Sequence, residues 1–184
     1  MRTGFLRTLT AAFIAITAAA SCAKTEAEQA DEAAAKNIAT FVSAQLGADS
    51  TRTATYNKGV VRLTLTEGSG EGLKKGGKVT FHYAGYTFTS AGISASNMFA
   101  TNMSSAASES GWNLSGEDAF MPVVMTLGES GMLKGLELGL TGVKSGEDCY
   151  ILFVSEYGYG KHNYGTVSAN TALAYRISVE NVEN

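Results

Sequence analysis

The chain has 184 residues, enough for one domain of ordinary size and an appendage. Its formal net charge is −3 and it has no basic stripe, which excludes a nucleic-acid-binding protein because nothing would neutralise the phosphates. Two histidines, two cysteines and no clustered carboxylates leave too few ligands for a metal site. The sequence also lacks a serine elbow and a dinucleotide fingerprint, so its function is expected to depend on the shape of an apolar binding surface.

The first 21 residues have the pattern of an export signal. Arg2 and Arg7 give a positive start, and the apolar or small-residue run 9–20 is too short to cross a bilayer. Small residues precede Cys22 in an arrangement that resembles the lipidation motif of bacterial lipoproteins, with Ala19 where that motif prefers leucine. We therefore expect residues 1–21 to be a lipoprotein signal peptide and Cys22 to be the lipidated first residue. The alternative is an ordinary signal peptide cleaved elsewhere, with Cys22 incidental.

This anchor predicts an exported protein attached by lipid to a bacterial membrane in the cell envelope. The outer membrane is the expected location, with the domain on its periplasmic or surface side. Acidic residues follow Cys22 almost at once, in a run that resembles a surface-display signal. An acidic helix start explains the same run equally well.

Residues 22–57 are predicted to form an N-terminal helix and a linker. The segment 25–46 is rich in helix-forming residues, and Gly47 is well placed to end the helix. Its apolar residues form a narrow stripe at a spacing of four: Ala34, Ile38, Val42 and Leu46. Two arrangements would cover this stripe: the helix packs on its own domain, or it joins two chains in a homodimer. The polar segment 48–57 is predicted to be the linker.

Four later segments alternate apolar and polar residues, the period of a strand with one buried face. Their apolar positions are Val61, Leu63 and Leu65; Val79, Phe81 and Tyr83; Met121, Val123, Met125 and Leu127; and Leu173, Tyr175, Ile177 and Val179. The apolar run 150–154 predicts a further strand that is covered on both faces. His82 lies on the face opposite Tyr83, so we expect it outside any pocket that Tyr83 lines. Five or six strands and one short late helix predict an α+β fold, an antiparallel half-barrel sheet wrapped on that helix.

The segment 90–119 is rich in serine, alanine, asparagine and glycine. A run of this length without a structural period is unusual inside a compact domain, so we expect an inserted loop. Trp112 lies within it and either caps a pocket or anchors the insertion to the body of the domain.

The segment 127–160 has the most informative pattern in the chain. It indicates a strand end, a glycine turn, a short helix, a second turn, the apolar strand 150–154 and a Gly-Tyr-Gly loop. The apolar residues of the helix recur at helical spacing: Met132, Leu133, Leu136 and Leu140. A helix packed on this strand would place its first turn beside the loop 157–159, with a free backbone N–H at the rim. We therefore expect an apolar cup with aromatic walls.

These motifs resemble those of the FKBP-type peptidyl-prolyl isomerases. The resemblance rests on Leu127-Gly128, Met132-Leu133-Lys134-Gly135-Leu136, Gly146-Glu147 and Tyr157-Gly158-Tyr159-Gly160, and on Val79 to Gly85 upstream. It covers about residues 59–182, in the order of the family. It implies an isomerase domain at 58–184 with an insertion at about 90–119, an activity that needs no cofactor, and proline-containing peptides or unfolded protein segments as partners.

The resemblance also assigns roles to residues of this chain. The catalytic residues it implies are Tyr83, Phe99, Leu133 and Tyr159, and the substrate-binding residues are Val123, Met132, Leu136 and Tyr175. Leu133 would donate its backbone N–H to a substrate carbonyl, and Tyr159 would offer its hydroxyl to another. Leu136 would form the floor, where the best-known members of the family have tryptophan.

Several positions depart from the family. Ala100 replaces the aspartate that usually pairs with the Tyr83-type hydroxyl, Val123 stands where phenylalanine is common, and Tyr164 lies near the usual position of a histidine, with His162 displaced. We expect reduced isomerase activity and poor affinity for macrolide inhibitors. The alternatives are a degenerate domain that acts as a peptide-binding chaperone or as an accessory subunit of an envelope complex, and a structural lipoprotein with a decayed pocket.

Overall fold

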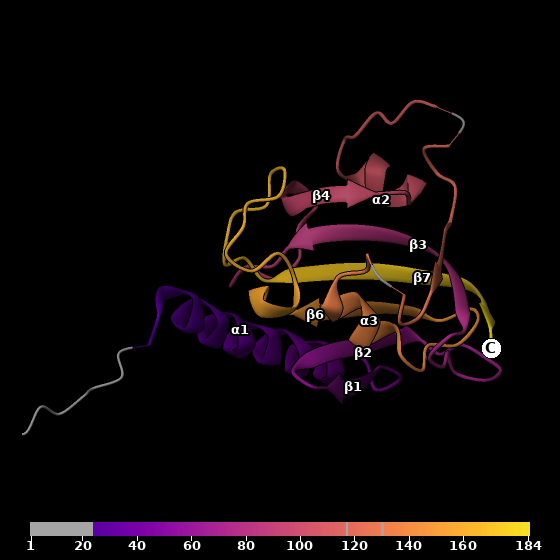
Figure 1. Ribbon diagram of the computed structural model, residues 1–184, viewed down its shortest axis with the longest axis horizontal. Coiled ribbons are helices and arrows are strands. Elements are labelled where there is room, and N and C mark those ends of the chain that lie inside the picture. The colour runs from indigo at the N-terminus through magenta and orange to yellow at the C-terminus, as the bar shows by residue number, and fades with distance from the viewer. Residues whose placement is uncertain (1–23, 117, 130) are drawn as a thin grey trace, which may run out of the picture.

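One antiparallel sheet forms the body of the protein in the computed structural model, which describes residues 24–116, 118–129 and 131–184 (Figure 1). The strands are ordered β1-β2-β6-β7-β3-β4, and β5 pairs with β3 beside β4. The strands are β1 Thr53–Asn57, β2 Val60–Thr66, β3 Lys78–Thr87, β4 Met98–Thr101, β5 Val123–Thr126, β6 Asp148–Phe153 and β7 Leu173–Glu183. The helices are α1 Glu26–Ala48, α2 Ser104–Glu109 and α3 Lys134–Leu140, with single turns η1 Ala95–Asn97 and η2 Ser155–Tyr157. This architecture confirms the predicted α+β fold.

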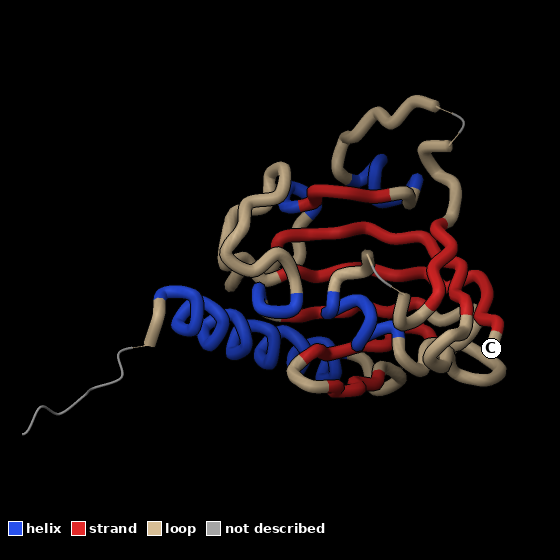
Figure 2. Tube along the Cα trace, in the orientation of Figure 1, coloured by secondary structure: helices blue, strands red, loops and turns tan. Residues whose placement is uncertain are grey.

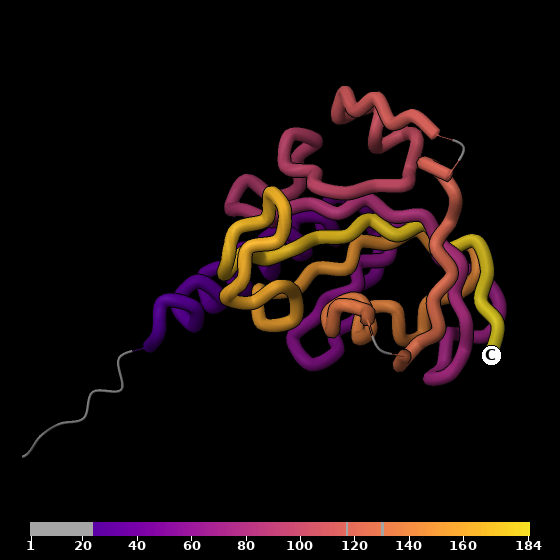
Figure 3. Tube along the Cα trace, turned by 45° about the horizontal axis from the view of Figure 1, so that its top comes forward, coloured from indigo at the N-terminus to yellow at the C-terminus, as the bar shows by residue number. Residues whose placement is uncertain are grey.

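The central strand β6 is buried on both faces, as its unbroken apolar run predicted. Cys149, Ile151 and Phe153 belong to the main core, the one that α3 covers. Leu152 and Val154 point the other way, into a second core beneath α1, the outer core. Figure 3 accordingly shows α3 in front of the sheet and α1 behind it. The sheet therefore separates two apolar cores.

The predicted N-terminal helix is present as α1. It starts with a capping box, in which the Glu28 amide donates to Thr25 Oγ1 at 3.3 Å and the Thr25 amide donates to Glu28 Oε2 at 2.7 Å. Ile38 and Val42 are 3% and 1% exposed against the outer core of the same chain. The apolar stripe is therefore covered by its own domain.

The segment predicted to be a linker contains a strand instead. Residues 53–57 form β1, which pairs with β2 in a hairpin. Lys58 (φ 49°) and Gly59 (φ 88°) supply the two left-handed positions that a tight hairpin turn requires. The prediction was wrong here because β1 is short and mostly exposed, with Ala54 as its one side chain packed on a core, so hydrogen bonding to β2 is what forms this edge strand.

The predicted insertion is only partly a loop. Residues 98–101 form β4, which pairs with β3 across a register shift, and residues 104–109 form α2. Ala106 and Ala107 of α2 are buried, and Ala106 packs with Met98 and Met103. The long connection from α2 to β5 has no regular structure in its described part (Figure 2). Packing therefore forms a helix in a segment whose composition did not predict one.

The C-terminal end of α3 is held by a charged side chain from β2. Arg62 donates to the carbonyls of Gly139 at 3.1 Å and Thr141 at 2.7 Å. The guanidinium lies 3.1 Å from the carboxylate of Glu147, which is 4% exposed and also accepts from the hydroxyl of Thr64. A cation at the last carbonyls of a helix satisfies groups that have no partner within the helix. Arg62 therefore fixes one end of α3 against β2.

Two glycines bring α3 unusually close to β6. A Cβ at Gly135 would lie 2.4 Å from the Phe153 ring, and one at Gly139 would lie 2.2 Å from Ile151 Cγ2. Any larger residue would overlap with the main core and push the helix away from the sheet. The distance between α3 and the sheet, and with it the space between them, depends on these glycines.

Cys22 and the predicted signal peptide lie outside the described residues. Among the residues that the structure does describe, no helix combines the length and hydropathy needed to cross a membrane.

We expect Gly139→Ala to lower the free energy of unfolding by about 1–3 kcal/mol, the usual cost of overpacking a core. Gly47→Ala is the matched control, because a Cβ at this position of α1 has nothing within 4 Å. That control should be neutral or stabilising by up to about 1 kcal/mol, since alanine favours a helix. Urea unfolding of both variants measures the difference, and equal midpoints would contradict the close approach of α3.

Candidate functional site

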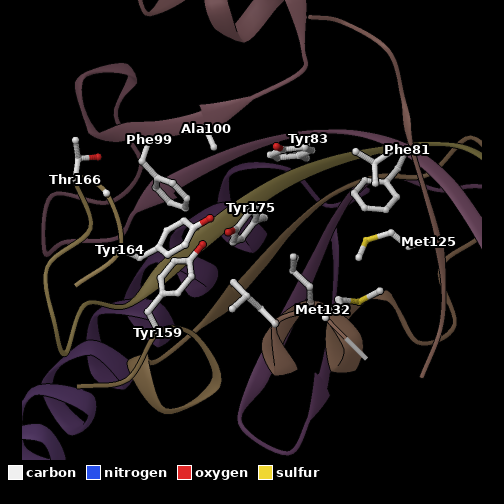
Figure 4. Close-up of a pocket in the computed structure, with 15 residues that line it drawn as sticks. Phe81, Tyr83, Phe99, Ala100, Met125, Met132, Tyr159, Tyr164, Thr166 and Tyr175 are labelled. Atoms are coloured by element: carbon white, nitrogen blue, oxygen red, sulfur yellow. The ribbon is translucent and has the colours of Figure 1, made fainter. Parts of the chain in front are cut away.

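A pocket of about 320 Å³ lies between α3 and the concave face of the sheet (Figure 4). Its lining consists of Phe81, Tyr83, Phe99, Ala100, Val123, Met125, Gly131, Met132, Leu133, Leu136, Tyr159, Tyr164, Gly165, Thr166 and Tyr175. None of these side chains carries a charge at neutral pH. The pocket is therefore apolar, and its polar groups are hydroxyls and backbone atoms.

The strand period explains how the sheet lines this pocket. Phe81 and Tyr83 on β3 are two residues apart and point to the same face, as do Val123 and Met125 on β5. Tyr83 belongs to the main core, whereas the ring nitrogens of the intervening His82 lie 3.3 Å from the Asn102 carbonyl and 2.9 Å from Glu180. His82 lies outside the pocket, as its place on the opposite face predicted.

Tyr175 is the centre of the aromatic wall. It lies on β7, is buried, and stacks on Phe153 with a centroid distance of 6.0 Å and an angle of 13°. Phe99 meets its ring edge-on at 5.8 Å, and Tyr83 lies 6.2 Å away. Offset and edge-to-face contacts of this kind are the favourable geometries for aromatic rings. Strands β3, β4, β6 and β7 thus hold Tyr175 between rings that can move little.

A second aromatic pair forms the rim. Tyr159 and Tyr164 stack with their centroids 4.3 Å apart and their planes 9° from parallel. Figure 4 shows both hydroxyls directed towards Tyr175. Burial raises the pKa of Tyr159, and it raises the pKa of Tyr175 further, with the neighbouring Tyr159 phenol adding to the effect. These hydroxyls therefore remain protonated, as neutral hydrogen-bond donors, throughout the physiological range.

The opposite wall comes from the segment that leads into α3. Leu133 is the N-cap of the helix, has no side-chain cap, and lines the pocket beside Met132 and Leu136. Its backbone N–H has no hydrogen-bond partner among the described residues. The first amides of a helix have no acceptor within it, which makes this N–H a candidate donor to a ligand carbonyl. The sequence pattern placed Met132 and Leu133 in the helix, whereas α3 begins after both of them, at Lys134.

The structure brings all eight predicted site residues to this one pocket. They are Tyr83, Phe99, Leu133, Tyr159, Val123, Met132, Leu136 and Tyr175. Which of them contact a substrate stays a prediction. Trp112 is not part of the lining, so it does not cap the pocket.

Sequence reasoning missed several lining residues. Phe81 and Met125 could have been found, because each lies two residues from a predicted site residue on the same strand face. Thr166 lies in the loop after Tyr159, where no period indicates which side chains turn inward. Tyr164 lies in the same loop, and only the family resemblance had singled it out, near the usual position of a histidine.

The described lining of the site contains no histidine, cysteine, lysine or carboxylate. Its titratable side chains are tyrosines, and no cluster of three potential metal ligands occurs in residues 24–116, 118–129 and 131–184. Ala100 lines the pocket at the position where the resembling family usually has an aspartate. What the arrangement can do is enclose an apolar group and hold peptide carbonyls with neutral donors.

Comparisons with known proteins find the same family that the sequence motifs resemble. The family model described as FKBP-type peptidyl-prolyl cis-trans isomerase matches residues 70–180. The chain is 26% identical over 121 residues to FK506-binding protein 1 of Aspergillus oryzae, covering 66% of this chain and 96% of that protein. It is 30% identical over 109 residues to the FK506-binding protein of Neisseria meningitidis serogroup B, covering 59% of this chain and 82% of the relative.

Two solved structures share the fold. The three FKBP domains of wheat FKBP73 match with a TM-score of 0.55 and 20% identity, over 71% of this chain and 50% of the wheat chain. FkpA from Escherichia coli matches with a TM-score of 0.53 and 19% identity, over 84% of this chain and 63% of its own. The chain thus spans about half of the wheat structure and under two thirds of the bacterial one. The family model covers more than half of the present sequence, and the chain therefore belongs to the FKBP-type peptidyl-prolyl cis-trans isomerase family.

Proposed function

We propose that the protein is a peptidyl-prolyl cis-trans isomerase that assists the folding of proteins outside the cytoplasm. Membership of the family implies this activity. The observation that supports it best is the pocket lining, which combines apolar and aromatic side chains with neutral hydroxyls and no charged group. Its substrates are proline-containing segments of peptides or unfolded proteins.

Prolyl isomerisation suits such a site because the reaction is a rotation. Its barrier, about 18–20 kcal/mol, comes from the partial double-bond character of the C–N bond. No proton has to move and no covalent intermediate has to form. The twisted imide has lost resonance and charge separation, so it depends less on water than either planar form does. A surface that binds the twisted form better than the planar ones lowers the barrier.

The chain's own residues have distinct parts in this proposal. Tyr83, Phe99 and Tyr175 would enclose the proline ring from the sheet, with Leu136 as the floor. The Leu133 amide and the Tyr159 hydroxyl would hold peptide carbonyls while the bond turns. The Leu133 amide directly precedes α3 and Tyr159 lies in the turn after η2, so both donors would be in place before the bond rotates.

A binding function without turnover is the second candidate, and Ala100 favours it. Figure 4 shows the Tyr83 hydroxyl on the side of the pocket where Ala100 lies. An aspartate at this position would supply an acceptor for that hydroxyl, and alanine cannot. The domain would then hold proline segments as a chaperone, or as a subunit of an envelope complex.

The location outside the cytoplasm is proposed from the first 22 residues. A basic start, an apolar run and a cysteine after small residues support export and lipid attachment at Cys22. A single acyl chain binds membranes only weakly, so stable attachment would need more than one chain.

We expect Leu133→Pro to lower kcat/KM for a proline peptide by at least about tenfold, because it removes one positioned donor. The backbone can accept it, since φ at Leu133 is −58° and proline fixes φ near that value. Leu133→Ala is the matched control, since it shortens the side chain and keeps the N–H. Tyr159→Phe removes the other donor and should lower kcat/KM severalfold. The measurement is a protease-free isomerisation assay.

The two candidate functions give different results in this assay. Wild-type protein with no rate above background that still binds the peptide would contradict the isomerase and leave the binding function. Equal rates for Leu133→Pro and Leu133→Ala would contradict the role of the amide.

We expect kcat/KM to be constant between about pH 6 and pH 9. The only titratable side chains in the pocket are tyrosines, and burial raises the pKa of Tyr159 and Tyr175 above the ordinary value near 10, so neither ionises in this range. A group whose pKa is raised in the folded state stabilises the fold below its unfolded pKa and ceases to do so as pH rises through the folded pKa. The stability that these two tyrosines contribute should therefore be lost only above about pH 10. A bell-shaped rate profile centred near neutrality would contradict a site without acid or base.

We expect Cys22→Ala to abolish the incorporation of radiolabelled palmitate when the chain is expressed in a bacterium that processes lipoproteins. The protein should then move from the membrane fraction to the soluble fraction. Cys149→Ala is the control, since this cysteine is fully buried in β6 and should not affect labelling. Labelling that persists in Cys22→Ala would contradict the lipid anchor.

A further inference from the structure

The turn that carries Tyr159 is organised around one buried residue, Ser155. Its side chain and backbone are 2% exposed, and its carbonyl accepts from the amides of Gly158 and Gly160, both at 2.9 Å. These two glycines are the immediate neighbours of Tyr159. The position of the Tyr159 backbone is thus set by the position of the Ser155 peptide group.

The amide of Ser155 is bound in turn by a residue from the other end of the chain. Asp31 Oδ1 accepts from the Ser155 N–H at 2.9 Å, and Asp31 Oδ2 accepts from the Glu156 N–H at 3.3 Å. One carboxylate therefore binds two successive amides at the start of the turn η2. Hydrogen bonds with one charged partner are about twice as strong as neutral ones.

Asp31 is carried by a helix that is itself held firmly. It lies seven residues before Ile38, two helical turns along the stripe by which α1 packs on the outer core. Phe41 reinforces this packing through edge-to-face contacts with Phe88 at 5.6 Å and Tyr150 at 6.4 Å. The Asp31 carboxylate therefore binds the loop from a packed helix and not from a free chain terminus.

We infer that Asp31 is a positioning residue of the pocket, and that α1 is for this reason part of the site and not a spacer. This inference rests on the proposed function. Through Ser155, Asp31 fixes the turn on which Tyr159 stands, and so the distance between the Tyr159 hydroxyl and the substrate. The residues matched by the family model begin at position 70, so this contact comes from a part of the chain outside the matched domain.

A double-mutant cycle in the full mature chain separates positioning from simple stabilisation. We expect Asp31→Ala to lower kcat/KM about fivefold, the effect of losing a capping interaction of ordinary strength. In a Tyr159→Phe background the same change should cost less than about twofold, because the group that it positions is absent. Asp31→Asn should be intermediate, since the amide keeps one acceptor oxygen. Glu32→Ala is the matched control, on the exposed neighbour of Asp31, and should change nothing in the loop.

Hydrogen exchange gives a readout that does not depend on activity. The amides of residues 155–160 should exchange faster in Asp31→Ala than in wild type, and the amides of β7 should not. An equal loss of kcat/KM in both backgrounds, unchanged exchange in the loop, or the same effects in Glu32→Ala would overturn the inference. Wild-type protein without isomerase activity would overturn the proposed function alone. In that case the double-mutant cycle is repeated with the Kd for a proline peptide as the measured quantity. Additive effects of Asp31→Ala and Tyr159→Phe on this Kd would overturn the role of Asp31.

Discussion

The close approach of α3 to β6 is the constraint on which the rest of the structure depends. Gly135 and Gly139 let the helix backbone lie directly on Phe153 and Ile151, and Arg62 binds its last carbonyls. The helix cannot move outward without losing this packing. It cannot move inward either, because its backbone already lies against Phe153 and Ile151. The position of α3 sets the width of the pocket. It also places Leu133 and Leu136 on the side of the pocket opposite the sheet. A short helix of seven residues would have little stability alone, so these contacts are also what forms it.

The burial of the pocket explains which kinds of polar group it contains. In an apolar surrounding a carboxylate or an ammonium group would need a partner, whereas a phenol needs only a hydrogen bond. In Figure 4 the Tyr159 hydroxyl is directed towards Tyr175, and the Tyr164 ring stacks on one face of the Tyr159 ring. The chain thus retains donors inside an apolar cavity without a titrating group. Such a site is suited to a rotation about a bond and unsuited to hydrolysis or group transfer.

The sequence predicts those parts of the fold and the site that a local period encodes. β7 and the two faces of β6 were foreseeable because their apolar residues alternate or run without interruption. β1 was not, because pairing through the Lys58–Gly59 turn stabilises a short strand whose side chains are mostly exposed. α2 depends on the burial of Ala106 and Ala107 after folding, which composition does not indicate. Tyr164 lies in a loop without a period, and Asp31 meets Ser155 across 124 residues.

The two cores explain why the N-terminal helix and the pocket are connected. β6 contributes alternate residues to each core and ends at Phe153, and Val154 follows it directly before the turn that leads to Tyr159. α1 packs on the outer core with Ile38 and Val42 and reaches the same turn with Asp31. A homodimer through α1 remains a proposal, and it would have to use the exposed face of the helix, because the apolar stripe already packs on the outer core within one chain. Such a dimer could form without disturbing the contact between Asp31 and Ser155, so dimerisation through α1 and positioning of the pocket are compatible roles of one helix.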